Sequence, residues 1–209
     1  MEKKLPLFPL NLVAFPGEKL NLHIFEPRYK SLINDCLDQR STFGIPSYVL
    51  SKIEYGTEVK ITELSKQYED GRMDIKTEGV QVFKVKDYQN PLSDKAYAGG
   101  NVVMKTMQDQ LDPQHNQELL ELANVLFSWL HVKEEITLIK ETVLYEIIHK
   151  IGLKPEEEYG LLKMDSEIQR QKYVIDHLKK LIPALERAEK AREKVKMNGH
   201  FKHLDPLKF

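Results

Sequence analysis

The chain has 209 residues, enough for one large domain or two small ones with a hydrophobic core. Hydrophobic residues make up 41% and charged residues 30%, which is the composition of an ordinary soluble protein. The formal net charge of −1 excludes an overall positive field that would attract nucleic acid or an anionic membrane.

The chain begins with an apolar run preceded by Lys3 and Lys4, an arrangement that imitates a signal peptide. Proline and asparagine residues interrupt this run, and no small-residue cleavage site follows it. No stretch approaches the roughly 18 unbroken apolar residues that a membrane-spanning helix needs. We therefore expect a cytoplasmic protein that does not contact a membrane.

Residues 5–29 carry most of the local structural information. The run LPLFPL at Leu5–Leu10 is apolar, but its two prolines exclude a helix, so we expect an edge strand or an extended segment. Phe15–Glu18 has the sequence FPGE, which predicts a turn because proline presets one φ angle and glycine supplies a positive one. Residues 20–24 alternate between apolar and polar, which predicts a half-buried strand. Glu26–Tyr29 has the sequence EPRY and opens a helix, since proline is tolerated in the first turn.

These motifs also resemble a known family. LPLFPL, then FPGE, then L-x-IFEPRY follow one another at short spacings, as at the start of the Lon protease amino-terminal domain. The resemblance continues more weakly over most of the chain, and it implies a free-standing LON substrate-binding domain with a PUA-like β-barrel. One departure is that the family usually has an arginine shortly before the phenylalanine at Phe83, where Gln81 and Val82 stand here.

The pattern after residue 29 remains mostly that of strands. A short amphipathic helix carries Cys36 on its apolar side, and we expect this single cysteine to be a buried thiol in a reducing compartment. Strands are then predicted at residues 43–50, 59–64, 73–77 and 80–85, with a tight hairpin turn at Asp70-Gly71. A strand at residues 97–107 would close the barrel. Residues 1–108 are therefore predicted to form the mainly antiparallel PUA-like β-barrel that the resemblance implies.

From residue 109 onward the apolar period becomes that of helices. Asp112 and Pro113 fit the N-cap and first residue of a helix. A second apolar stripe spans residues 136–151, Pro155 opens a short helix, and Asp165 or Ser166 caps a long last one. Pro183 should kink or break that helix. We therefore expect an α+β fold, in which a helical bundle at residues 109–209 follows the barrel.

The motifs of several enzyme classes are missing from the sequence. It has no P-loop, no G-x-S-x-G nucleophile elbow and no H-E-x-x-H zinc helix. A full Lon protease also carries an ATPase module and a Ser-Lys peptidase, and we expect neither to fit in this chain. His200 and His203 share a terminal tail without further ligands, so no metal site is predicted. We predict no enzymatic activity and no cofactor.

The candidate binding residues come from the N-terminal motifs. They are Phe8, Phe15, Pro16, Phe25, Glu26, Arg28 and Tyr29. The aromatic residues could line an apolar groove for unfolded peptides, as the resemblance implies, or they could be the core of a small barrel. Phe15 is the best candidate for exposure, because it lies in a turn. Glu26 and Arg28 could stabilise the helix start or contact a ligand.

The first functional hypothesis is a non-enzymatic module that binds unfolded or hydrophobic peptide segments or a protein partner, such as a protease or chaperone. The alternative is an RNA-binding module, because the barrel resembles PUA domains that hold structured RNA. The neutral net charge argues against nucleic acid, since phosphate contacts need clustered lysine and arginine. Only the family name supports a third hypothesis, an unrecognised hydrolase.

Overall fold

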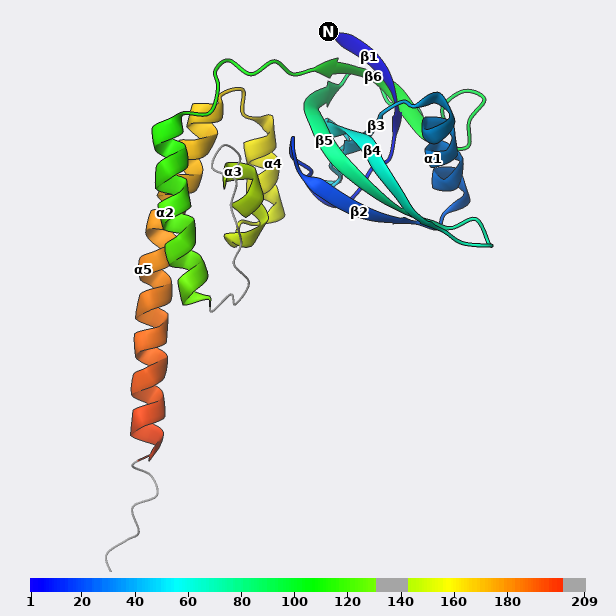
Figure 1. The fold of residues 1–209 in the computed structure, drawn as a ribbon. Helices are drawn as coiled ribbons and strands as arrows, with labels where there is room; N and C mark the ends of the chain where they lie inside the picture. The colour runs from blue at the N-terminus through cyan, green and yellow to red at the C-terminus, as the bar shows by residue number, and fades with distance from the viewer. Residues whose placement is uncertain (131–142, 201–209) are drawn as a thin grey trace, which may run out of the picture.

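The computed structural model describes the backbone of residues 1–130 and 143–200 and the side chains of residues 1–130 and 143–196. Strands dominate the first half of the chain and helices the second, and the two halves lie side by side (Figure 1). The predicted α+β fold, a barrel followed by helices, is therefore confirmed.

The barrel is built from one sheet. Its strands are β1 (Glu2–Leu7), β2 (Lys19–Ile24), β3 (Phe43–Pro46), β4 (Tyr55–Gln67), β5 (Met73–Val85) and β6 (Ala98–Met104). Their order is β2-β5-β4-β3-β1-β6, and β5 also pairs with β6. Five strands therefore close into a ring, and β2 lies outside the ring against β5. Among these pairings only β1–β3 is parallel, so the prediction of a mainly antiparallel barrel is confirmed.

β1 lies inside the ring, between β3 and β6, and the expected edge position is wrong. Its ladder with β6 accommodates Pro6. Gly99 faces Pro6 across this ladder and directs its own N–H to the Gln89 carbonyl oxygen at 2.9 Å. The pair of Pro6 and Gly99 is therefore one that exchanges no hydrogen bonds, and the proline removes no donor from the β1–β6 ladder.

The predicted hairpin at Asp70-Gly71 joins β4 to β5, and Gly71 has the positive φ of 79° that such a turn favours. The two strands expected on either side of Gly79 form one continuous strand, β5. Gly79 does not interrupt this strand. Its lack of a side chain lets β5 pass close to the turn that follows β1. A Cβ atom at Gly79 would lie 2.0 Å from the Phe15 carbonyl oxygen, so only glycine fits this approach.

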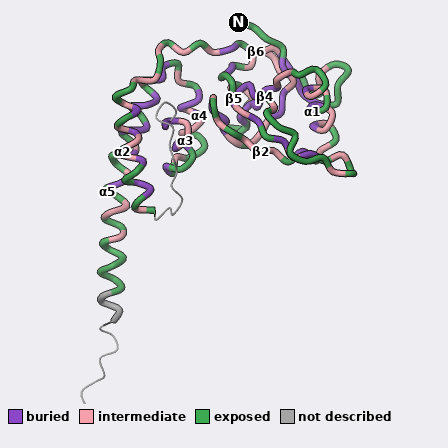
Figure 2. Tube along the Cα trace, viewed as in Figure 1, coloured by how far each residue is buried: buried purple, intermediate pink, exposed green. Residues whose placement is uncertain are grey.

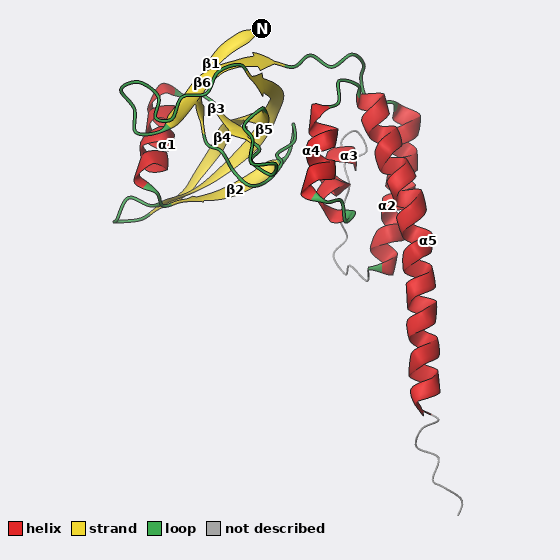
Figure 3. Ribbon diagram, turned by 180° about the vertical axis from the view of Figure 1, so that it is seen from behind, coloured by secondary structure: helices red, strands yellow, loops and turns green. Residues whose placement is uncertain are grey.

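The helix α1 (Pro27–Gln39) follows β2 and packs against the barrel (Figure 3). It begins at Pro27, as expected, and its apolar stripe is buried. Cys36 lies in this stripe, and burial raises the pKa of its thiol. The predicted burial of Cys36 is confirmed.

The second half contains α2 (Pro113–Trp129), α3 (Val143–Ile147), a 3₁₀ turn (Ile148–Lys150), α4 (Pro155–Lys163) and α5 (Glu167–His200). The predicted caps are present, since the Asp112 carboxylate accepts from the His115 N–H at 2.9 Å, and the Ser166 hydroxyl accepts from the Gln169 N–H at 3.1 Å. Part of the predicted second stripe, at residues 136–142, lies outside the described residues, as does His203.

Pro183 does not break α5, which continues to His200. Its neighbours Leu178 and Ile182 remain buried in the helical core, and this packing offsets the hydrogen bond that proline removes. Beyond Pro183 the residues are mostly exposed (Figure 2), so the charged run at residues 186–196 is a solvated helix face, as predicted.

The hydrophobic core is continuous from the barrel into the helices. Val13, Phe15 and Val82 of the first half belong to the same buried cluster as residues of α2, α3, α4 and α5. A linker of irregular structure joins β6 to α2 close to the predicted boundary at residue 108. The division of the chain into domains at residues 1–108 and 109–209 stays a prediction.

Candidate functional site

The structure does not bring the seven predicted binding residues together. Phe8 and Tyr29 are buried, and their rings lie on one another with centroids 3.8 Å apart. They belong to the core that α1 closes over the barrel. For these two residues the structure selects the core interpretation, because the helix covers them.

Phe15 is fully buried, so the expectation that it is exposed is wrong. Its ring centroid lies 6.0 Å from that of Tyr145 and 5.5 Å from that of His149, both in the helical half. The turn at Pro16 does carry Phe15 to the surface of the barrel. The helices pack on that surface and cover the ring.

Phe25 is the exposed member of the predicted set, with 60% of its surface accessible. It stands directly after β2 and before the N-terminus of α1. Glu26 and Arg28 follow it and are half-exposed, and the Arg28 Nε–H donates to the Glu26 carboxylate at 2.9 Å. The Arg28 guanidinium also lies 4.5 Å from the centre of the Tyr29 ring. Glu26 and Arg28 thus pair with each other beside the start of α1 and remain accessible, and the Glu26 side chain makes no N-cap hydrogen bond.

Two further aromatic residues extend this surface, and the sequence did not single them out. Tyr48 is 46% exposed in the loop after β3, which ends earlier than predicted. Tyr88 is half-exposed in the loop after β5. Burial raises the pKa of Tyr88, the Arg28 guanidinium lowers it and the Tyr48 hydroxyl raises it, so Tyr88 lies within electrostatic range of both side chains. We call Phe25, Arg28, Tyr48 and Tyr88 the aromatic face.

A second group of rings adjoins Phe25 along the β4–β5 hairpin. The His23 ring lies 6.1 Å from Phe25 and 6.0 Å from Tyr68, and its Nδ1 lies 2.6 Å from an Asp74 carboxylate oxygen. His23 is exposed, as predicted. The guanidinium of Arg72 lies 5.0 Å from the centre of the Tyr68 ring. Phe25, His23 and Tyr68 therefore form a row of rings at the end of β2, beside the β4–β5 hairpin.

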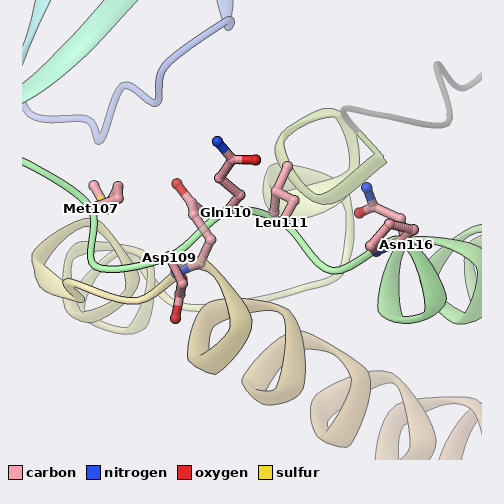
Figure 4. A pocket seen from close by; sticks show the side chains of 7 residues that line it. Met107, Asp109, Gln110, Leu111 and Asn116 are labelled. Atoms are coloured by element: carbon pink, nitrogen blue, oxygen red, sulfur yellow. The ribbon is translucent and has the colours of Figure 1, made fainter.

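A cavity of about 620 Å³ lies where the linker meets the first turns of α2 and α5 (Figure 4). It is lined by Met107, Asp109, Gln110, Leu111, Pro113, Asn116 and Glu167. The Asp109 carboxylate accepts from the backbone N–H groups of Glu167 at 2.6 Å and Ile168 at 3.2 Å, and so caps α5. The Glu167 carboxylate accepts from Arg170 and Tyr145. Both acids therefore hold the helices together, and we assign them no chemical role.

The family to which this sequence is similar agrees with the fold described above. Residues 4–180 match the ATP-dependent protease La (LON) substrate-binding domain, and this match spans most of the chain. The chain belongs to the LON substrate-binding domain family. The family and the barrel that the N-terminal motifs predicted are both confirmed.

Solved LON domains have the same fold. A Lon N-terminal domain protein from Xanthomonas campestris superposes with a TM-score of 0.65 and 26% identity, over 83% of this chain and 98% of that one. The N-terminal domain of a Mycobacterium avium complex Lon protease superposes with a TM-score of 0.64 over 85% of this chain and 98% of that one. Its identity is only 13%, so this second likeness shows the fold alone.

A curated relative matches a shorter part of the LON domain. The protein cereblon of Danio rerio is 32% identical over an alignment of 94 residues, which covers 41% of this chain and 22% of cereblon. The match thus spans about a fifth of that relative's length.

Gln81 and Val82, which stand where the resemblance implies an arginine, each have a structural role in this LON domain. Val82 is buried in the core that joins barrel and helices. The Gln81 side-chain amide donates to the Lys105 carbonyl oxygen at 2.7 Å and so fastens β5 to the start of the linker. Val82 therefore serves packing, and the exposed Gln81 serves a hydrogen bond between β5 and the linker.

Neither a metal-binding cluster nor a membrane-spanning helix occurs among the residues that the structure describes. No group of three or more His, Cys, Asp or Glu side chains there is arranged to hold a metal ion. None of the described helices is long and apolar enough to cross a membrane.

His149 joins the barrel to the helices of this LON domain. Its Nε2 lies 3.2 Å from a carboxylate oxygen of Glu18, beside the Pro16 turn, and its Nδ1 lies 2.8 Å from a carboxylate oxygen of Glu158 on α4. Burial alone would lower the pKa of His149, but the two carboxylates raise it to about 9. Only the imidazolium donates from both ring nitrogens, so His149 must be protonated to bind both carboxylates.

We expect His149 to stabilise the LON domain in a way that depends on pH. Its folded pKa of about 9 exceeds the unfolded value, so the contribution is complete below pH ~6.5 and is lost as pH rises through about 9. Urea unfolding of the wild type and His149→Gln from pH 6.5 to pH 10 checks this. The difference between their unfolding free energies should shrink with rising pH. A difference in unfolding free energy that stays constant across this range would contradict a stabilising role of protonated His149.

Proposed function

We propose that this LON domain is a non-enzymatic binding module that holds unfolded or hydrophobic peptide segments, or a protein partner, through the aromatic face. The observation that carries the proposal is the exposure of Phe25, at 60%, in the segment that opens α1 and next to the His23 ring. Large exposed aromatic residues in loops are typical anchors of protein interfaces. The family, described as a substrate-binding domain, supports the same class of function.

The distribution of charge supports a peptide over RNA. Two cations beside the aromatic rings are paired with acids, since Arg28 contacts Glu26 at 2.8 Å and Arg72 contacts Asp70 at 2.7 Å. Phosphate binding requires clustered cations that remain available. An apolar peptide needs only the rings. We propose that the partners are unfolded polypeptides in the cytoplasm, with a protease or chaperone as the protein that receives them.

We expect Phe25→Ala to weaken capture of an unfolded protein by about tenfold, because truncating an anchor residue costs about 1–2 kcal/mol of binding free energy. The probe is reduced, carboxymethylated lactalbumin, which is permanently unfolded, and the measurement is fluorescence anisotropy of the labelled probe. Since Phe25 is exposed, the variant should unfold at nearly the wild-type urea concentration.

The matched control is Tyr173→Ala, which removes a ring that is 37% exposed on α5, away from the aromatic face. This control should capture the probe with wild-type affinity. Equal affinities of Phe25→Ala and the wild type would remove the aromatic face from the proposal.

A further inference from the structure

β2 is the edge strand of the sheet. It pairs with β5, and the ring of five strands closes without it, so its other side faces no described strand. In Figure 1 this strand borders the barrel on the side away from β1 and β6. An edge strand presents a row of backbone donors and acceptors that can pair with another extended chain.

The register identifies the backbone groups on the free side. The Gly79 N–H donates to the Glu18 carbonyl oxygen at 2.8 Å, and the Thr77 hydroxyl donates to the Leu20 carbonyl oxygen at 3.1 Å. The carbonyl groups at even positions therefore face β5. Hydrogen-bonded and non-hydrogen-bonded pairs alternate along an antiparallel ladder. The outward N–H and C=O groups of β2 are consequently those of Lys19, Asn21 and His23, three exposed residues.

Natural edge strands usually carry features that prevent pairing, such as a proline, a bulge or several lysines. β2 contains neither proline nor a register shift, and Lys19 is its one lysine. Phe25 directly follows the strand, and its exposed ring extends the row formed with His23 and Tyr68. The free edge therefore leads straight to the aromatic face.

We propose that the free edge of β2 binds an extended segment of an unfolded polypeptide as an added strand, with an apolar side chain of that segment on Phe25. A row of backbone donors and acceptors is complementary to another extended backbone and to no particular side chain. Such pairing recognises the unfolded state and not a sequence. The inference rests on the proposed function and specifies how the peptide is held.

Amide hydrogen exchange measured by NMR on the full chain tests this pairing directly. Without a probe, the amides of Lys19, Asn21 and His23 should exchange fast, and those of Leu20 and Leu22, which face β5, should exchange slowly. Saturation with reduced, carboxymethylated lactalbumin should slow the three outward amides by at least about tenfold, because hydrogen bonding protects them.

Asn21→Pro provides the matching variant. Proline removes an outward N–H and no hydrogen bond of the β2–β5 ladder, and such a position tolerates proline. Affinity for the probe should fall by about three- to tenfold, the loss expected for one hydrogen bond and its neighbours. The control Asn21→Ala keeps the N–H and should bind like the wild type. If Asn21→Pro fails to fold, the exchange measurement on the wild type decides alone.

The outcomes separate this inference from the function on which it rests. Capture of the probe without slower exchange at the three outward amides, or with full affinity by Asn21→Pro, would overturn strand addition and leave the binding function intact. Outward amides that are already protected in the probe-free protein, together with a dimeric mass, would assign the edge to a second copy of the chain and overturn the inference. No capture by the wild type would overturn both proposals.

Discussion

Phe15→Ala is expected to lower the free energy of unfolding by about 3–5 kcal/mol, the cost of deleting a buried phenylalanine side chain. The ring is fully buried between the barrel and the helices, where it contacts Tyr145 and His149. Its loss would leave a cavity at the junction of the two halves. From its position in a turn alone, Phe15 would be exposed and Phe15→Ala would cost under about 1 kcal/mol. The measured loss of stability therefore distinguishes a buried Phe15 from an exposed one.

Urea unfolding at neutral pH measures this loss, with Phe25→Ala as the control. Both variants delete the same side chain, but Phe25 is 60% exposed and should change the unfolding free energy by less than about 1 kcal/mol. Two equal losses would mean that the helices do not cover Phe15 in solution.

Arg170→Ala is expected to destabilise the protein by about 3–5 kcal/mol, as is typical when one partner of a buried ion pair is removed. Arg170 is fully buried at the start of α5. Its guanidinium donates to the carbonyl oxygens of Leu161 and Met164, at 3.0 Å each, and to the Tyr145 hydroxyl at 2.7 Å. It also pairs with the Glu167 carboxylate. Without the arginine, the carbonyl oxygens would lose a buried donor and the Glu167 carboxylate would lose its cationic partner.

The control for this variant is Arg192→Ala on the same helix. Arg192 is exposed and lies 3.8 Å from Glu189, so its removal should cost less than about 1 kcal/mol. The double variant Arg170→Met with Glu167→Met should recover part of the loss, because it removes the unpaired charge as well. An Arg170→Ala variant as stable as Arg192→Ala would show that the network contributes little.

The binding surface was only partly predictable. Phe25 and Arg28 belong to a motif that the sequence marks clearly, and they are accessible in the structure. Tyr48 and Tyr88 come from two separate loops and carry no motif of their own. Loop aromatic residues become a surface only when folding brings the loops together, which no local pattern records.

The sequence by itself determined the starts and periods of most elements. Pro27 and Asp112 begin helices, Gly71 turns a hairpin, and the change from strand to helix period near residue 109 separates barrel from helices. These features are local, because they depend on the φ angle and hydrogen-bonding capacity of individual residues. The family motifs belong to the same local level.

Only the tertiary structure decided which surfaces are covered. Phe15 lies in a turn, yet the helices from the other half of the chain bury it. Glycine is typical of a break between strands, yet Gly79 lies within β5, where it allows a close approach to the Phe15 backbone. β2 has the pattern of any half-buried strand, and its free edge follows from the order in which the ring closes. Burial and pairing depend on segments that are distant in sequence, so local periodicity predicts an element and cannot predict its neighbours.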